Sequence, residues 1–84
     1  MSEKEVARVT HYFTRLNVAV LALTDTLSVG DRIHVYGRST DFEQALDSMQ
    51  IEHKPVLKAG PGDDIALKCD ERVREGDIVY RVTN

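Results

Sequence analysis

Apolar and polar residues alternate in short runs along this chain, and such runs predict β-strands joined by turns. The cleanest alternation is in residues 64–69, where Ile65, Leu67 and Cys69 share one face of the predicted strand. Further strands are predicted at residues 5–13, 17–24, 31–37 and 77–82. The pattern as a whole indicates a protein built from strands.

A Gly-Asp pair precedes three of the apolar runs, with the glycines at Gly30, Gly62 and Gly76. Glycine adopts a positive φ without steric cost, and an Asp carboxylate can accept hydrogen bonds from nearby backbone N–H groups. Each pair therefore predicts a tight turn that starts a strand. Three such turns in 84 residues predict a small all-β fold with short connections.

Residues 41–50 are ambiguous in the local pattern. Apolar residues at positions i, i+3, i+4 and i+7, counted from Phe42, predict a ten-residue helix. The alternative is a bulged strand that places Phe42, Gln44 and Leu46 on one face. On periodicity alone we expect the helix, and the bulged strand stays open as its alternative.

Length and composition limit the kind of protein this can be. The 84 residues predict one domain over residues 1–84, and a net charge of −3 restricts any nucleic-acid contact to a local patch. Cys69 is the only cysteine, which excludes an internal disulfide and a cysteine-based metal cluster. The longest aliphatic run, residues 18–23, is too short to span a bilayer. With no secretory signal pattern at the start, we expect a cytoplasmic protein without a membrane partner.

Catalytic and cofactor signatures are missing from the sequence. The phosphate-binding loop of a GTPase does not occur, so we expect no GTP binding. His11, His34 and His53 have no short chelating spacing, so neither a metal nor a cofactor is predicted. No nucleophile–base pair or carboxylate dyad stands out, and we expect no enzymatic activity.

Several segments in a fixed order resemble a known family. They are VTHYF at residues 9–13, LSVGDRI at 27–33, TDFEQ at 40–44, GDDIALK at 62–68 and EGDIVY at 75–80. This order resembles the second domain of translation GTPases of the elongation factor Tu type, and more closely the translation elongation factor-like proteins. The barrel appended to some collagenase-like U-type peptidases is also similar. The resemblance covers the chain from about residue 5 to residue 82.

The resemblance implies a closed, six-stranded, antiparallel Greek-key barrel. It also implies that residues 41–52 form a long bulged strand and not a helix. In elongation factor Tu this domain helps to hold the aminoacylated end of tRNA with an acid and a Phe-Arg pair. The aligned positions here are Gln50, Glu52 and His53, so that function does not carry over.

The most concentrated aromatic feature is His11-Tyr12-Phe13 in the first strand. His11 and Tyr12 could stack on nucleobases while Arg8 and Arg15 reach phosphates, as in single-strand binders. The alternative is structural: Phe13 lies in the core, Tyr12 packs on the barrel wall, and His11 is a hydrogen-bonded edge residue.

A second candidate surface follows the strand at residues 31–37 into its loop. Arg32, His34, Tyr36 and Arg38 occupy alternating positions and could form a basic stripe with an aromatic residue in it. The alternative is an ordinary solvated strand face.

Two functions are open at this point. The first is a non-enzymatic, stand-alone β-barrel that binds RNA (tRNA or rRNA) or a ribonucleoprotein in a translation-related process. The second is a protein-interaction module that docks on a separate GTPase or catalytic subunit, through an apolar patch around Tyr12, Leu16 and Leu57. Either function would use the same candidate residues, namely Arg8, His11, Tyr12, Arg15, Arg32, Tyr36 and Arg38.

Overall fold

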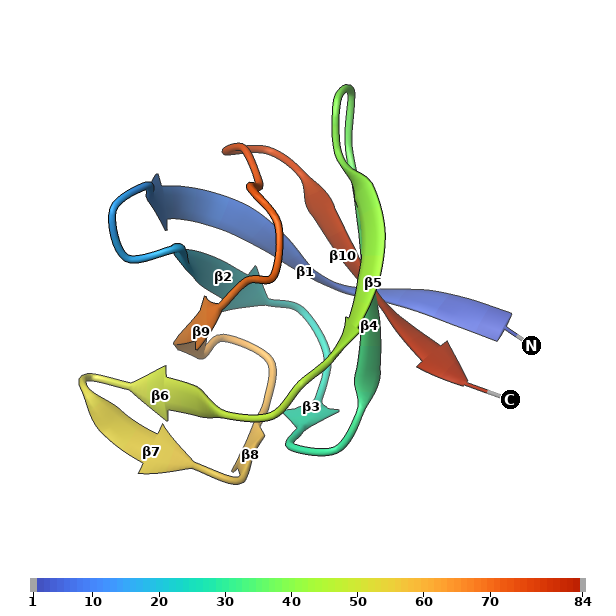
Figure 1. The fold of residues 1–84 in the computed structure, drawn as a ribbon. Helices are drawn as coiled ribbons and strands as arrows, with labels where there is room; N and C mark the ends of the chain where they lie inside the picture. Colours follow the sequence, from blue (N-terminus) through green and yellow to red (C-terminus); the bar gives the residue numbers. More distant parts are fainter. Residues whose placement is uncertain (1, 84) are drawn as a thin grey trace.

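The computed structural model describes residues 2–83, and within this range the fold consists of strands and turns with no helix (Figure 1). The strands are β1 Ser2–Phe13, β2 Val18–Leu23, β3 Leu27–Ser28, β4 Arg32–Tyr36, β5 Asp41–Ala45, β6 Met49–Ile51, β7 Lys54–Val56, β8 Lys58–Ala59, β9 Asp64–Lys68 and β10 Ile78–Thr83. Every ladder between them is antiparallel. The predicted all-β antiparallel fold is confirmed. No helix in the described part of the chain is long and apolar enough to cross a membrane.

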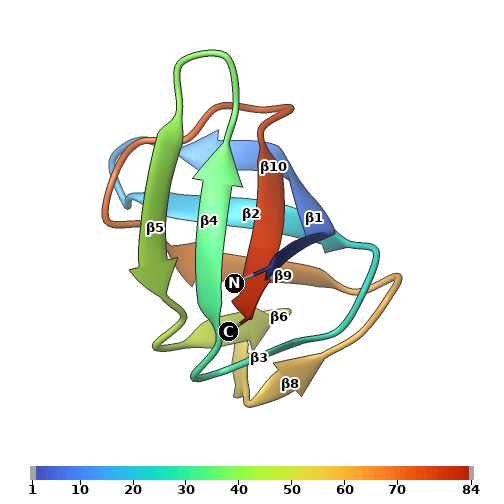
Figure 2. The same cartoon turned by 90° about the vertical axis from the view of Figure 1, so that its right-hand side faces the viewer.

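Eight strands form one sheet in the order β5-β4-β10-β1-β2-β9-β6-β7, and β3 pairs separately with β8. Figure 2 shows β5, β4 and β10 side by side, with β1, β2 and β9 crossing behind them. The two layers enclose the apolar core. Its largest fully buried side chains are Val6, Val9, Leu21, Leu27, Ile33, Val35, Leu46, Met49, Ile65, Val73 and Val79.

The predicted closed six-stranded barrel is wrong. The strand order within residues 2–83 begins at β5 and ends at β7, and no ladder joins these two strands. The side chain of Gln44 on β5 instead spans the gap between β5 and the end of β9. Its Nε2 donates to the carbonyl of Lys68 (3.1 Å), and its Oε1 accepts the N–H of Asp70 (2.8 Å). A side-chain amide thus supplies hydrogen bonds that a closing backbone ladder would otherwise make.

The three Gly-Asp turns are confirmed in detail. Gly30, Gly62 and Gly76 have φ values of 101°, 89° and 92°. In each turn the carboxylate of the following Asp accepts the backbone N–H of the residue three positions before it, at 2.9 Å. The backbone N–H of the same Asp donates to the carbonyl of that residue, at 3.0–3.1 Å. The turns therefore share one geometry, as their common sequence predicts.

Residues 41–50 form strands, so the helix predicted from periodicity is wrong. β5 pairs with β4, an irregular stretch follows, and β6 begins at Met49. Phe42, Gln44 and Leu46 are buried on one face, as the bulged-strand alternative expected. Pairing with β4 satisfies the backbone while every second side chain enters the core, and this tertiary context overrides the helical pattern.

Gly37, directly after β4, lies against the third Gly-Asp turn. A Cβ atom at Gly37 would lie 2.6 Å from Cγ of Asp77, and the Oδ1 atom of Asp77 is closer still. Asp77 is buried, and its other carboxylate oxygen holds the turn at Arg74. The absence of a side chain at Gly37 therefore makes room for the Asp77 carboxylate.

Candidate interaction surfaces

The aromatic residues of β1 do not form one stacking platform. A β-bulge shifts the β1–β2 register between Val9 and His11, and it reverses the alternation of side chains beyond it. Tyr12 therefore packs against the core, and its hydroxyl donates to Oδ1 of Asn17 (3.2 Å). Phe13 is 45% exposed, so the expectation that it lies in the core is wrong.

His11 lies on the exposed side of β1 with Phe13. The two rings meet edge to face, with their centroids 4.3 Å apart. Nδ1 of His11 is 3.6 Å from a carboxylate oxygen of Glu75. The imidazole therefore has an aromatic neighbour on β1 and an acidic neighbour from the last turn.

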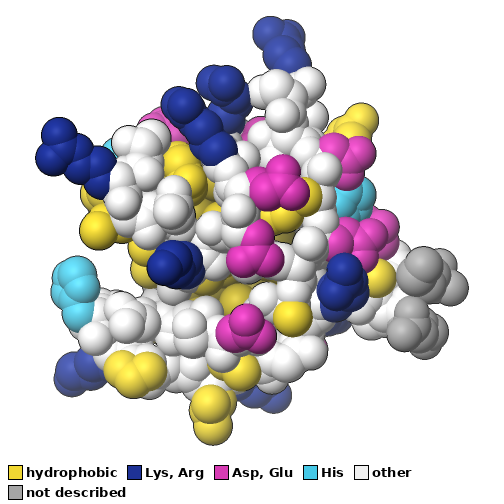
Figure 3. Space-filling view, in the orientation of Figure 1, with side chains coloured by type: hydrophobic (Ala, Val, Ile, Leu, Met, Phe, Trp, Pro, Cys, Tyr) yellow, Lys and Arg dark blue, Asp and Glu magenta, His cyan; other side chains and the backbone are white. Residues whose placement is uncertain are grey.

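The tip of the β1–β2 hairpin forms an open hollow of about 440 Å³. Tyr12, Phe13, Arg15 and Leu16 line it together with Thr14. Leu16 is 63% exposed, because the turn places it outside the sheet. The turn is formed by a hydrogen bond from the Leu16 N–H to the Phe13 carbonyl and by Asn17, which has a φ of 56°. Figure 3 shows hydrophobic side chains at the surface beside this hairpin and, separately, over β6 and β7.

Arg8 is not part of this tip. Arg8 lies within β1, seven residues before Arg15 in the sequence. Its register partner on β10 is Ile78. At about 3.3 Å per strand residue the two arginines are roughly 20 Å apart along the chain. Of the four candidate residues in this region, the structure brings Tyr12 and Arg15 together at the hollow and leaves Arg8 and His11 outside it.

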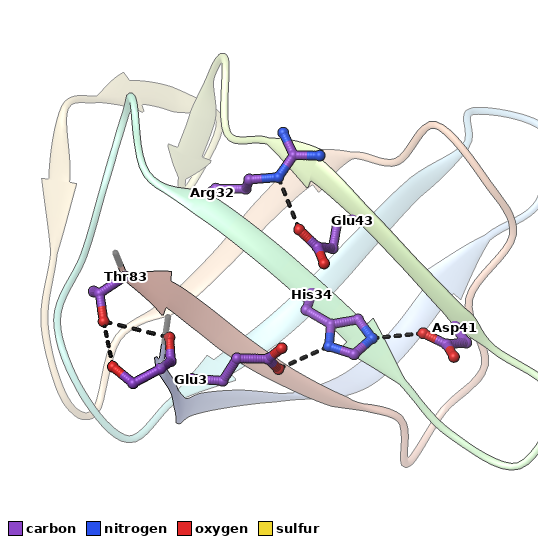
Figure 4. Close-up of polar contacts among 7 residues, drawn as sticks. Glu3, Arg32, His34, Asp41, Glu43 and Thr83 are labelled. Carbon is purple, nitrogen blue, oxygen red and sulfur yellow. Dashed lines mark hydrogen bonds and ion pairs between the residues drawn. The ribbon is translucent and has the colours of Figure 1, made fainter.

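The outward positions of β4 are Arg32, His34 and Tyr36, as alternation predicts. Carboxylates surround the cationic members (Figure 4): Nε of Arg32 donates to Oε1 of Glu43 at 2.8 Å. Arg38 lies beyond the strand, in the β4–β5 loop, where it lines a polar hollow of about 430 Å³ with Tyr36. On β4 itself the cationic side chains of Arg32 and His34 are therefore paired with carboxylates and do not form an uncompensated basic stripe.

His34 on β4 links the next strand, β5, to the distant N-terminal strand β1, which lies beyond β10 in the sheet. Its Nδ1 is 2.7 Å from Oε1 of Glu3 on β1, and its Nε2 is 2.6 Å from Oδ1 of Asp41 on β5 (Figure 4). Only a protonated imidazole can donate from both nitrogens. The hydrogen bonds that the imidazole donates, first to Glu3 and then to Asp41, raise the pKa of His34 above its usual value. The sequence analysis noted His34 but missed Glu3 and Asp41, because local spacing shows neither the β4–β5 register nor that β1 and β4 both pair with β10.

The thiol of Cys69 and the exposed side chain of Leu57 lie away from both candidate surfaces. Cys69 is buried, and burial raises the pKa of its thiol to about 11. Within residues 2–83 no three His, Cys, Asp or Glu side chains are grouped to hold a metal ion. Leu57, which is 79% exposed, lines a second apolar hollow of about 340 Å³ with Val29 and Val56. It therefore does not share a patch with Tyr12 and Leu16.

Proteins with similar sequences are much longer than this chain. No protein-family model matches it. An uncharacterized protease from Methanocaldococcus jannaschii is 39% identical over 77 residues, which are 90% of this chain and 19% of the protease. A collagenase from Porphyromonas gingivalis is 35% identical over 72 residues, which are 83% of this chain and 20% of the collagenase. The chain thus spans about a fifth of the length of these relatives.

Two solved structures have a similar fold. Both are of the C-terminal domain of a putative U32 peptidase from Geobacillus thermoleovorans. One has a TM-score of 0.89 at 14% identity and covers 95% of this chain and 93% of that domain. Its selenomethionine variant has a TM-score of 0.86 at 15% identity, covering 90% and 96%. At these identities the likeness shows the fold alone.

These comparisons support one part of the family resemblance drawn from the sequence and not the other. The similarity to the domain appended to collagenase-like peptidases is confirmed. The resemblance to elongation factors is not supported. The interpretation of this chain as a translation elongation factor-like, RNA-binding module is wrong, because the relatives are named protease and collagenase and the similar structures belong to a putative peptidase.

Proposed function

We propose that this chain is a non-catalytic accessory module that docks against a catalytic protein domain through the tip of the β1–β2 hairpin. The observation that carries the proposal is the pair of apolar side chains Phe13 and Leu16, which stay 45% and 63% exposed around an open hollow. Exposed apolar side chains grouped in one place are typical of protein-interaction sites. This is the protein-docking alternative drawn from the sequence.

The tip also has the residue types that contribute most to protein interfaces. Tyr12 and Arg15 line the hollow, and Tyr and Arg are enriched among residues whose truncation weakens binding most. The hydrogen bond from Tyr12 to Asn17 and the packing of the ring on the core hold Tyr12 in place before binding. A pre-ordered side chain loses less conformational entropy when a partner covers it.

The similarity to peptidases supports the same proposal. The chain matches about a fifth of each relative, and its fold is that of a C-terminal domain of a putative peptidase. The one thiol, Cys69, is buried with a raised pKa, which is the opposite of an activated nucleophile. Under this proposal residues 1–84 act as one domain, and peptide-bond hydrolysis is the task of a separate or attached catalytic domain.

The test is a titration of the ¹⁵N-labelled chain with the part of the M. jannaschii relative that lies outside the matched 77 residues. We expect amide shifts centred on residues 12–16. Leu16→Ser should weaken binding by about tenfold or more, which corresponds to about 1.4 kcal/mol. Leu57→Ser is the matched control, because Leu57 is more exposed but lines a different hollow.

Three outcomes would contradict the proposal. They are an unchanged spectrum at residues 12–16, equal losses from the two Leu→Ser variants, or hydrolysis of gelatin by the isolated chain.

A further inference from the structure

Residues 2–5, at the start of β1, form an exposed segment that we call the N-terminal arm. Within residues 2–83 the only ladder partner of the arm is β10, because the pairing of β1 with β2 begins at Ala7. All residues of the arm are exposed, whereas Val6 and Ala7 are fully buried. Figure 1 shows the arm and the end of β10 extending together from the body of the molecule. The arm is therefore attached to the sheet along one side only.

A β-bulge marks the end of the arm. The β1–β10 register shifts between Glu5 and Ala7, so that Val6 is the bulged residue. The Val6 side chain lies in the core, and its carbonyl accepts the N–H groups of Thr24 (2.8 Å) and Asp25 (3.3 Å). Segments with little buried apolar surface open locally at a lower free energy than core strands do. Val6 is thus the point at which the fixed part of β1 begins and about which the arm can detach.

Two ion pairs hold the arm, one on each face of the sheet. Glu3 and Lys4 point to opposite faces because they are successive residues of a strand. Nζ of Lys4 is 2.6 Å from Oδ2 of Asp25, and Oε1 of Glu3 is 2.7 Å from Nδ1 of His34 (Figure 4). Lys and Asp side chains ordinarily titrate far from neutral pH, whereas imidazole titrates close to it. The contact with His34 is therefore the attachment that a change of pH near neutrality can break.

A neutral imidazole cannot keep both of the hydrogen bonds of His34. It has one N–H, so it donates either to Glu3 or to Asp41. Asp41 is fixed, because it is in register with Tyr36 in the β4–β5 ladder and is followed by the buried Phe42. We therefore expect the remaining proton on Nε2, which is 2.6 Å from the Asp41 carboxylate. The lone pair of Nδ1 then faces a carboxylate oxygen of Glu3, and two acceptors form no hydrogen bond.

Carboxylates outnumber cations around His34. Within residues 2–83 the charged and titratable groups that face the ring are Arg32 and Tyr36 of β4, Tyr80 of β10, Glu3 and Glu5 of β1, and Asp41 and Glu43 of β5. When the imidazole is neutral, Arg32 is the one cation left in this group, and it is bonded to Glu43. The His34 side chain is 18% exposed, so water screens these charges only in part. Loss of the proton therefore leaves both carboxylates of the arm facing those of β5 without a compensating charge.

We infer that protonation of His34 controls the attachment of the N-terminal arm: the arm is held on the sheet while both ring nitrogens carry a proton, and it detaches about Val6 when the imidazole is neutral. Detachment removes the ladder partner of β10 at residues 80–83. The hydrogen bonds to Glu3 and Asp41 raise the pKa of His34. The arm should therefore be held below about pH 6.5 and should detach as the pH rises through the higher folded value.

This inference is independent of the proposed docking function. The N-terminal arm and the tip of the β1–β2 hairpin lie at opposite ends of β1 (Figure 1). Detachment of the arm leaves the residues of the hairpin hollow in place, and occupation of the hollow leaves the contacts of His34 unchanged. Each proposal can therefore fail while the other holds.

Amide hydrogen exchange of the ¹⁵N-labelled chain, followed by NMR from about pH 6 to about pH 9, tests the inference. Each rate is divided by the rate of an unstructured amide at the same pH, which removes the effect of base catalysis. We expect the protection of amides in residues 3–5 and 80–83 to fall by about tenfold as His34 loses its proton. The amides of Leu21 and Ile65, in the β2–β9 ladder, report global unfolding and should remain more protected than the arm at every pH.

Two results of this experiment would overturn the inference. Unchanged protection of the arm across the titration would mean that only the Glu3 side chain moves. Equal protection of the arm and of the β2–β9 ladder at every pH would mean that the arm does not detach by itself.

The ring nitrogens of His34 give a second readout. Imidazole ¹⁵N shifts show which nitrogen carries the proton, and His34→Gln assigns the signals. We expect protons on both nitrogens at low pH and on Nε2 alone at high pH. A neutral form with its proton on Nδ1 would keep the bond to Glu3 and would contradict the inference.

Two variants of the arm isolate the contact with His34. In Glu3→Gln the new amide accepts from the protonated imidazole through its oxygen and donates to the neutral one through its nitrogen. The arm should then keep its protection over the whole pH range. Glu5→Gln is the matched control, because it removes the same charge from the same exposed arm at the position in register with Tyr80. It should retain the fall in protection of about tenfold.

The comparison of the two variants decides between the contact and the net charge. Loss of the pH dependence in both variants would assign the effect to the charge of the arm. Persistence of the pH dependence in Glu3→Gln would assign the effect to a different titrating group. Either result would refute control of the arm by the His34–Glu3 contact.

Discussion

The contact between Gly37 and Asp77 gives a quantitative test of the structure. In Gly37→Ala the new Cβ would overlap the Asp77 carboxylate, whose Cγ is 2.6 Å from the Cβ position. No positive φ is involved at Gly37, so the whole cost comes from this overlap. Rotating Asp77 away relieves the overlap but breaks its bond to the Arg74 N–H.

The expected loss of stability follows from the two ways to accommodate the new Cβ. Either the site stays overpacked, or Asp77 rotates away and loses its hydrogen bond. Overpacking a buried site costs about 1–3 kcal/mol, and a hydrogen bond to a charged group contributes about 1.5–3 kcal/mol. We therefore expect Gly37→Ala to lower the free energy of unfolding by about 2–3 kcal/mol. For a domain of this size that is a fall in Tm of roughly 10–20 °C. Gly60→Ala is the control, because its Cβ would meet nothing within 4 Å.

A double-mutant cycle then identifies the cause. Asp77→Ala removes the overlapping carboxylate and leaves only a Cβ contact of 3.3 Å. In that background Gly37→Ala should cost less than about 1 kcal/mol, so the two substitutions are strongly non-additive. Urea unfolding of the four proteins measures each step. If the costs add to within about 0.5 kcal/mol, the overlap is not what makes Gly37 necessary.

Two further predictions use the same denaturation assay. Gln44→Leu leaves the Asp70 N–H and the Lys68 carbonyl without their partner and should cost about 2–3 kcal/mol. The exposed Gln50→Leu should be nearly neutral, and equal costs for the two would show that Gln44 does not bridge the gap between β5 and β9. The raised pKa of His34 means that its protonated form stabilises the fold. This stability should be complete below about pH 6.5, the unfolded value, and should be lost as the pH rises through the higher folded pKa. In His34→Gln the decline above about pH 6.5 should disappear, and an unchanged slope would contradict the assignment.

Local chemistry made several features of this protein predictable. The Gly-Asp pairs determine their turns because the donor, the acceptor and the flexible glycine lie within four residues of one another. Alternation on β4 gives the outward positions of Arg32, His34 and Tyr36 for the same reason. At residues 41–50 the local signal favoured a helix, and only the family resemblance favoured the strand that forms.

What the sequence determined by itself was therefore the all-β class, the three turns and the side of most strands that faces the core. Three things were decided by the tertiary structure alone. The bulge between Val9 and His11 moves Phe13 outward, Gln44 spans the gap between β5 and β9, and His34 meets Glu3 from 31 residues away. The physical reason is the same in each case. A period-two pattern specifies which side a residue faces, whereas strand order, register and seams depend on which distant segments satisfy one another's backbone groups and fill the common core.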